Sequence, residues 1–149
     1  MISIKRWDNG EVIHSGDFKS VKECLEDGVS KGVSFYRADL IGSNLRDSNL
    51  SCSNLSYSSL IGSNLSFSNL SGSNLIGSDL RGAIGNGTEV KSLQVSPHKL
   101  TYYNGELWGG CTHKTCEDWL AYEGEGLDES DKEYLEKITK PFIRMCEGV

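Results

Sequence analysis

Leucine recurs at every fifth residue from Leu40 to Leu80, and this spacing constrains the fold more than any other feature of the chain. An α-helix repeats every ~3.6 residues and a flat β-strand every ~2 residues, so neither places a five-residue period on one face. Ala or Ser stands two residues before each of these leucines, and Asp, Asn or Ser stands directly before it. Such a repeat requires a solenoid, in which each unit buries its apolar side by stacking on the next unit.

The repeat resembles the pentapeptide-repeat family, whose consensus is A-(D/N)-L-x-x. The resemblance implies an all-β-dominated fold, a right-handed quadrilateral β-helix in which four pentapeptides make one square turn, with small α/β caps at both ends. The leucine and the small residue point inward in that family, and the other three residues point outward. The structural core is therefore expected at Phe35, which is in register one unit upstream, and at Leu40, Leu45, Leu50, Leu55, Leu60, Leu65, Leu70, Leu75 and Leu80.

Serine replaces alanine at the inward small position in eight of the nine units from Ala38 to Ser78. A buried hydroxyl without a partner costs roughly 1–3 kcal/mol. Each inward serine is therefore expected to bond to nearby main chain or to the serine stacked on it, and we interpret these serines as structural.

The chain divides into three segments. Residues 1–35 predict an N-terminal cap: a β-hairpin turning at Asn9-Gly10 and then a helix with Ser20 as its N-cap. Residues 36–84 carry the β-helix, and residues 85–149 carry C-terminal strands and a helical tail.

Within the C-terminal segment we predict strands at residues 89–95, 99–103 and 106–108. One helix is expected to begin at a Thr115 cap and a second at Ser130. The second helix is expected to bend at Pro141. Its core-facing residues are expected to be Tyr134, Leu135, Ile138, Phe142, Ile143 and Met145.

Charge is unevenly distributed along the chain. Residues 1–35 carry five Lys/Arg and six Asp/Glu, residues 36–113 carry five of each, and residues 114–149 carry five against ten, which gives −1, 0 and −5 and sums to the net −6. No basic stripe is present, so direct nucleic-acid binding is not expected. No apolar stretch has the length of a signal peptide or a membrane span, so the sequence predicts a cytoplasmic protein that does not bind membranes.

Cysteine and histidine gather at Cys111, His113 and Cys116, with Cys146 or His98 as further candidates. These residue types at close spacing bind zinc. The stretch lacks a C-x2-C pair, however, and free cysteine is commonly a small buried hydrophobe, so we favour structural cysteines. No nucleophile, phosphate-binding loop or dinucleotide motif is recognisable, which predicts a non-enzymatic protein without a cofactor.

The layout as a whole is similar to a set of bacterial and phage pentapeptide-repeat proteins. They begin with a short hairpin and helix, and end with a G-C…T-x-x-x-W stretch before a helical tail that contains K-P. The matching residues here are Gly110, Cys111, Thr115, Trp119, Lys140 and Pro141.

We therefore expect a bacterial or phage binding protein that engages a host protein through its caps or its acidic tail. Candidate interaction residues are Trp108, Lys114, Trp119 and Tyr122, because Trp and Tyr are enriched at interface hot spots. A homo-oligomer is expected too, because so short a column buries little apolar area by itself.

Two alternatives remain open. One is a protein that sequesters a nucleotide signal, with Lys91, Lys99, His113 and Lys114 as phosphate partners. The other, implied by the resemblance, is a mimic of duplex DNA directed at DNA gyrase, although this repeat is neutral and short.

Overall fold

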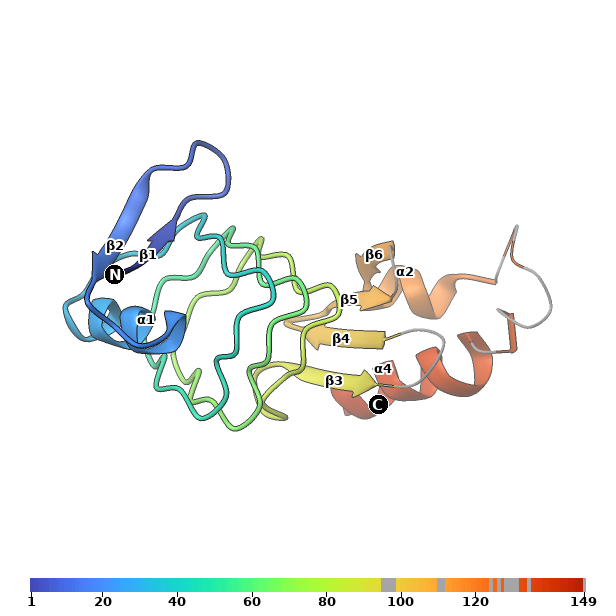
Figure 1. Cartoon of the computed structure of the whole chain (residues 1–149). Coiled ribbons are helices and arrows are strands. Elements are labelled where there is room, and N and C mark those ends of the chain that lie inside the picture. Colours follow the sequence, from blue (N-terminus) through green and yellow to red (C-terminus); the bar gives the residue numbers. More distant parts are fainter. Residues whose placement is uncertain are drawn as a thin grey trace.

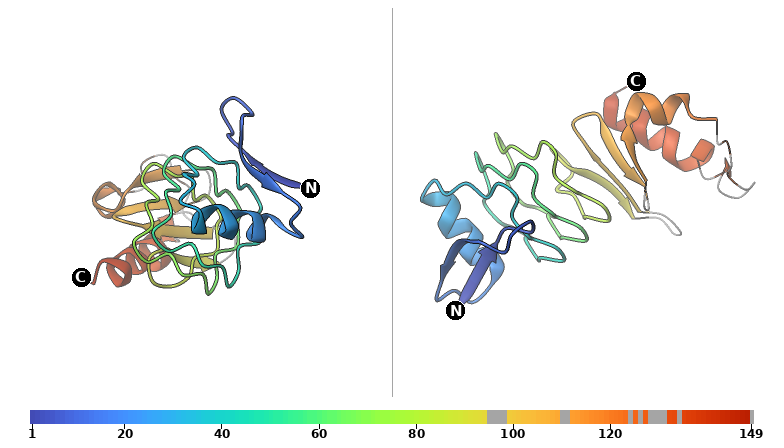
Figure 2. Two further views of the ribbon diagram at one scale, coloured as in Figure 1. Left: turned by 90° about the vertical axis from the view of Figure 1, so that its left-hand side faces the viewer. Right: turned by 90° about the horizontal axis from the view of Figure 1, so that it is seen from above.

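The computed structural model describes residues 1–94, 99–109, 112–123, 125, 127, 132–133 and 135–148. The molecule is elongated: a hairpin and helix, a coiled column, and a sheet backed by helices follow one another along its length (Figure 1, Figure 2). None of the helices in the described part is long and apolar enough to cross a membrane.

The N-terminal cap consists of strands β1 (Ile2–Lys5) and β2 (Val12–Gly16), which pair antiparallel, and helix α1 (Val21–Ser30). Ser20 is the N-cap of α1, because its side chain accepts a hydrogen bond from the amide of Glu23 at 3.2 Å. The Glu23 carboxylate in turn accepts from the amide of Lys19 at 2.9 Å, so two amides at the helix start are satisfied.

The column is held together by single parallel bridges between residues twenty apart, such as Asn44 with Asn64. Four pentapeptides therefore make each turn, and residues twenty apart stack in rows. Every corner is closed by a hydrogen bond like that from the Ser43 amide to the Leu40 carbonyl, at 3.1 Å. Because the bridges are one residue long, the named strands all lie in the two end sheets. Together with the helices of the caps, this makes the fold a mixed one rather than all-β.

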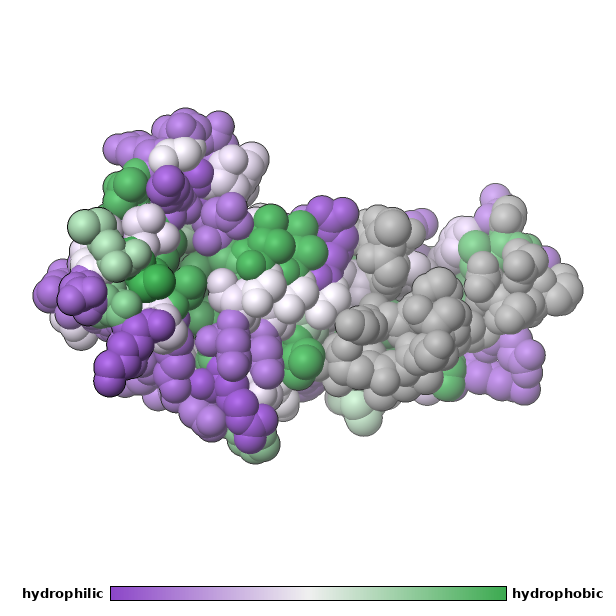
Figure 3. All heavy atoms as spheres, viewed as in Figure 1, coloured by the Kyte–Doolittle hydropathy of each residue, from purple (hydrophilic) through white to green (hydrophobic). Residues whose placement is uncertain are grey.

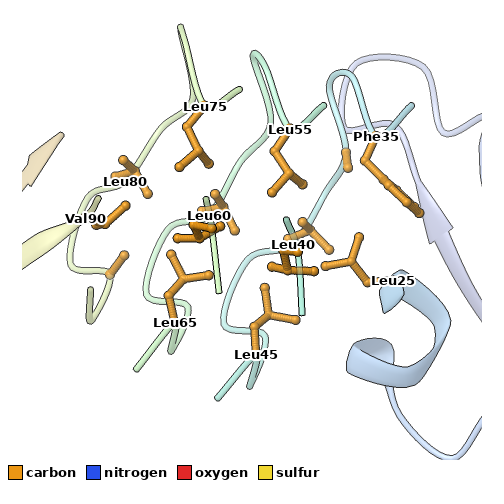
Figure 4. Close-up of a cluster of buried hydrophobic side chains, with 14 of the residues drawn as sticks. Leu25, Phe35, Leu40, Leu45, Leu55, Leu60, Leu65, Leu75, Leu80 and Val90 are labelled. Atoms are coloured by element: carbon orange, nitrogen blue, oxygen red, sulfur yellow. The ribbon is translucent and has the colours of Figure 1, made fainter. Parts of the chain in front are cut away.

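The core of the column is a stack of aliphatic side chains. All nine leucines of the repeat and Phe35 are at most 1% exposed. Figure 4 shows Phe35, Leu55 and Leu75 following one another along the column, with Leu25 of α1 at one end and Val90 at the other. Burying one such leucine contributes about 2 kcal/mol.

The inward serines do not all behave alike. Ser48 and Ser68 donate to the carbonyl of the leucine three residues earlier, at 2.7 and 2.6 Å, and Ser78 donates to a leucine carbonyl of the preceding turn at 2.7 Å. The hydroxyls of Ser53 and Ser63 are buried and have no hydrogen-bond partner among the described residues. The expectation that every inward serine is bonded is therefore wrong for these two, because their hydroxyls do not make the bond to the leucine carbonyl three residues earlier that Ser48 and Ser68 make.

The hairpin covers the exposed edge of the first turn. Arg6 next to β1 forms an antiparallel bridge with Ala38, and the Trp7 amide donates to the Arg37 carbonyl at 3.0 Å. An open edge offers unpaired main-chain groups to other chains. On this side of the column, the hairpin satisfies those groups instead.

The C-terminal sheet has the order β3 (Lys91–Gln94), β4 (Lys99–Tyr103), β5 (Glu106–Gly109) and β6 (Thr112–Thr115), all antiparallel. One face closes the column, because Tyr103 and Trp108 pack against its core. The Tyr103 hydroxyl accepts from the Leu75 amide at 3.3 Å, and the Thr101 hydroxyl donates to the Ala83 carbonyl at 2.9 Å. Side chains therefore satisfy main-chain groups at the column end.

The other face of this sheet packs on helix α2 (Cys116–Ala121), the π-helical turn η1 (Leu135–Thr139) and helix α4 (Lys140–Glu147). Thr115 caps α2 by accepting from the Asp118 amide at 3.1 Å. Pro141 lies in the first turn of α4, which follows η1 without a break, so the helical run passes from π-helical to α-helical geometry next to the proline. The expected bend at Pro141 stays a prediction.

Of the residues expected to face the core in this region, Leu135, Phe142 and Ile143 are buried and Ile138 is partly buried. Met145 is exposed, so its expected burial is wrong, because it projects from the outer side of α4. Ser130 and Tyr134 lie outside the described residues.

Candidate interaction surface

The four C-terminal residues expected to bind a partner are divided between the two faces of the sheet. Trp108 is buried against the column. Lys114, Trp119 and Tyr122 meet on the other side: the ammonium of Lys114 lies 4.4 Å from the Tyr122 ring centroid and 5.9 Å from that of Trp119. Trp119 is only 9% exposed, and its indole N–H donates to the Leu107 carbonyl at 3.3 Å. This cluster packs α2 onto β6 and offers little free surface.

The cysteines of the C-terminal segment lie in the apolar cluster under the sheet. Burial raises the pKa of the Cys116 thiol to about 12, and it also raises the pKa of Cys146. Both thiols therefore stay protonated and pack as small hydrophobes. Cys111 and His98 lie outside the described residues, as does the side chain of His113. In the part that the structure describes, no group of three or more His, Cys, Asp or Glu side chains could hold a metal ion.

Two of the three lysines expected to hold phosphate are engaged elsewhere. Lys91 donates to the Cys146 carbonyl near the end of α4 at 2.8 Å, and Lys114 lies over the two rings described above. The Lys99 side chain is outside the described residues.

Charges on the outside of the column are paired with each other. Arg81 pairs with Asp79 at 2.5 Å, so these column charges are balanced locally.

Among the residues that the structure describes, the arrangement nearest to a catalytic pair is in the N-terminal cap. His14 Nε2 lies 2.7 Å from an Asp27 carboxylate oxygen, which also binds Lys31 at 2.8 Å. The thiol of Cys24 donates to the main-chain carbonyl of His14 at 3.8 Å rather than to its ring. Nucleophilic catalysis requires a nucleophile bonded to the base, so these contacts tie β2 to α1 instead.

Large exposed side chains gather on one corner of the column beside the hairpin. They are 52% exposed at Trp7, 36% at Tyr36, 50% at Tyr57 and 57% at Ile76, and with Arg37 they make up what we call the aromatic corner. Figure 3 shows a hydrophobic patch on the visible face of the column and a largely hydrophilic hairpin beside it; tyrosine and tryptophan are pale on this hydropathy scale, so the rings of the aromatic corner do not stand out in this view. Residues 36, 56 and 76 form one row of this corner, and residues 37, 57 and 77 form the next.

The aromatic rings are fixed relative to one another. The indole N–H of Trp7 donates to the Tyr57 carbonyl at 2.8 Å, which joins the hairpin to the second turn of the column. The rings of Tyr36 and Tyr57 meet edge to face with their centroids 5.6 Å apart, and the Arg37 guanidinium lies 5.1 Å from the Tyr36 centroid. The surface is therefore ordered before any partner binds.

An ion-pair network of Asp8, Arg6 and Arg37 lies next to the aromatic corner. Asp8 accepts two hydrogen bonds from Arg6, at 3.0 and 2.7 Å, and one from Arg37 at 2.7 Å. These bonds hold the pKa of Asp8 at about 2, well below its usual range. The carboxylate thus fixes two guanidinium groups that border the rings.

Two residues of the aromatic corner occupy strained backbone positions. The second corner residue of each pentapeptide has a positive φ: 58° at Arg37 and 57° at Tyr57, but 71° at Gly77 in the same row. The left-handed conformation costs a residue with a side chain roughly 1–2 kcal/mol, and glycine avoids that cost. The same positive φ is found at Asp47, Cys52 and Phe67, so it belongs to the turn of each pentapeptide and does not by itself mark the aromatic corner.

A family model described as pentapeptide repeats matches residues 31–66, 48–84 and 63–90, with eight copies. Residues 31–90 belong to the pentapeptide repeats. Proteins of this family are generally non-catalytic and act through protein interactions. A search of curated proteins and a search of solved structures found no match.

Sequence reasoning did not single out the aromatic corner. Within pentapeptide repeats the two corner positions are free to vary, so Tyr36 and Tyr57 carry no periodic signal. Writing the chain in rows of twenty would have placed them on one corner. The contribution of Trp7 could not have been found that way, because it reaches Tyr57 across fifty residues of sequence.

Proposed function

We propose that this protein is a non-enzymatic binding module that engages a protein partner through the aromatic corner. The observation that carries the proposal is the exposure of Trp7 and Tyr57 beside Arg37 on a rigid column. Trp, Tyr and Arg are the residues most enriched among interface hot spots. The resemblance to bacterial and phage proteins favours a partner in a bacterial cell.

Rigidity supports this proposal as strongly as composition does. The rings are held by the indole hydrogen bond and by the Asp8 network, so binding would order few side chains. Each rotamer-rich side chain that is already immobilised saves about 0.5–1.5 kcal/mol on association. A right-handed quadrilateral column, as implied by the family, would present this corner as a flat and stiff surface.

The test compares two glycine variants. Tyr57→Gly removes an exposed ring and relieves a positive φ, so the fold should remain intact while binding is lost. Phe67→Gly is the matched control, because Phe67 is also exposed and has a φ of 60°, but belongs to another row of the column.

Wild-type protein and both variants would be immobilised and exposed to bacterial lysate, and the captured proteins quantified by mass spectrometry. We expect a protein that wild type and Phe67→Gly retain and Tyr57→Gly loses. If Tyr57→Gly captures the same proteins in the same amounts as wild type, the aromatic corner is not the binding surface.

A further inference from the structure

Three asparagines of the chain are followed directly by glycine: Asn9, Asn86 and Asn104. Such a pair can modify itself in water, because glycine has no side chain to hinder attack by its own amide nitrogen. That nitrogen forms a bond to Cγ of the asparagine, the Cγ–Nδ2 bond breaks, and the NH2 group leaves with the amide proton as ammonia. Water then opens the succinimide ring and gives aspartate or isoaspartate. The three pairs are alike in sequence, so the fold decides which of them reacts.

Asn86 is held firmly at the end of the column. Its Nδ2 donates to the Ser68 carbonyl at 3.1 Å and to the Glu89 carboxylate at 2.7 Å, and its Oδ1 accepts from two main-chain amides at 3.2 and 3.0 Å. The Gly87 amide, which would be the nucleophile, donates to the Val90 carbonyl at 2.9 Å. Attack requires the two reacting atoms to meet at about 3–3.5 Å in the right alignment. Because these bonds oppose that movement, the folded protein protects Asn86.

Asn9 lies in the exposed turn of the N-terminal hairpin and is held less firmly. Its Oδ1 accepts from the Glu11 amide at 2.9 Å, and its Nδ2 lies 3.4 Å from the Glu11 carboxylate. The Gly10 amide donates to the Arg6 carbonyl at 3.0 Å. A bonded amide gives up its proton less readily, so this pair is expected to react more slowly than one with an unbonded side chain and amide.

Asn104 is the least restrained of the three. It is exposed in the two-residue turn between β4 and β5, with a φ of 48° at Asn104 and 78° at Gly105. Within the described part of the chain, its side chain makes no hydrogen bond and the Gly105 amide has no main-chain acceptor. That amide lies near the Tyr102 hydroxyl, which is a weaker acceptor than a carbonyl. A Cβ atom at Gly105 would meet nothing within 4 Å, so the turn is not crowded.

We propose that Asn104 is a site of spontaneous deamidation, which the folded protein converts to aspartate and isoaspartate before it converts Asn9 or Asn86. Isoaspartate lengthens the main chain by one carbon atom. In a two-residue turn, that extra atom disturbs the pairing of Tyr103 with Glu106. Tyr103 packs against the core of the column, so the conversion loosens the C-terminal cap as the protein ages. The inference does not depend on the proposed function.

The test follows conversion at each Asn-Gly pair over time. Folded protein would be incubated in mildly alkaline buffer, which favours loss of the glycine amide proton, and peptide mapping by mass spectrometry would detect the replacement of NH2 by OH. A sample in guanidinium chloride is the reference, because all three pairs are then unfolded and should react at similar rates. In the folded protein we expect Asn104 to convert fastest. Asn86 should be slower than in the reference by at least about tenfold, since one or two net hydrogen bonds suffice for that factor.

The matched variants are Asn104→Gly and Asn9→Gly. Glycine also suits a positive φ in such a turn and cannot deamidate. During incubation the melting temperature of wild type and of Asn9→Gly should fall, while that of Asn104→Gly should stay constant. The inference is overturned if Asn104 does not convert in the folded protein, if Asn9 or Asn86 converts as fast, or if Asn104→Gly loses stability as wild type does.

Discussion

The unbonded hydroxyl of Ser63 leads to a prediction with a definite sign. Ser63 is fully buried, and its Oγ has no partner among the described residues. Leaving a hydroxyl in this condition costs about 1–3 kcal/mol. Ser63→Ala removes that cost. It also leaves a void smaller than a water molecule, which destabilises the protein by roughly 0.3 kcal/mol at ~24 cal/mol per Å³. Ala83 occupies the same row one turn later, which shows that alanine fits there.

We therefore expect Ser63→Ala to stabilise the protein by about 1 kcal/mol, which raises the melting temperature of a chain this size by about 3 °C. The matched control is Ser68→Ala. It removes a 2.6 Å hydrogen bond from the hydroxyl to the Leu65 carbonyl and should destabilise by about 1 kcal/mol. The two variants change the same atom in neighbouring pentapeptides, and their melting temperatures should differ by about 6 °C.

Differential scanning calorimetry at neutral pH measures both variants against wild type. The reasoning is refuted if Ser63→Ala lowers the melting temperature as much as Ser68→Ala does, because the Ser63 hydroxyl would then have a partner of comparable strength. Equal and small effects would show instead that inward hydroxyls contribute little in either condition.

Three further changes test the caps. Gly28→Ala should destabilise by about 2 kcal/mol in thermal unfolding, because its new Cβ would lie 2.5 Å from the ring of Phe35, which is buried between α1 and the column. Tyr103→Phe removes the acceptor of the Leu75 amide and should cost about 1 kcal/mol in chemical denaturation, with no effect expected if water replaces the hydroxyl. The pKa of Asp8 is lowered from 3.8 to about 2, so its contribution to stability is present above pH 4 and is lost as the pH falls toward 2. The melting temperatures of wild type and Asp8→Asn should therefore converge over that range. A difference that stays constant with pH would contradict this role of Asp8.

Much of the column could be predicted, because a five-residue period leaves few geometries and each Leu is held in place by its neighbours. Helix starts were predictable because a cap depends only on nearby residues: the side chains of Ser20 and Thr115 each accept a hydrogen bond from the amide three positions later. Strand β6 was not expected, because Thr112–Thr115 has little β-pattern of its own and is a strand through its pairing with β5. The different environments of Trp108 and Trp119 also depend on that sheet.

The candidate surface was less predictable than the fold. Burial imposes a pattern on the sequence, whereas exposure imposes none, so an outward Tyr among outward Ser and Gly has no signature until the rows are aligned. The positive φ at Tyr57 is a property of the turn, and the sequence shows it only when the turn type is known.

The caps that close both ends of the column have a consequence for how many turns the column can have. The N-terminal cap reaches Tyr57 in the second turn, and the C-terminal sheet contacts Leu75 and Ala83 at the other end. A turn added between these contacts would leave both caps in place, so neither cap sets the number of turns. Inserting twenty residues of repeat would move the caps apart by one layer, ~4.8 Å, with their relative orientation kept. Inserting a single pentapeptide would instead rotate the C-terminal sheet by about a quarter of a revolution around the column axis. The number of pentapeptides between the caps therefore sets the angle between the N-terminal hairpin and the C-terminal sheet.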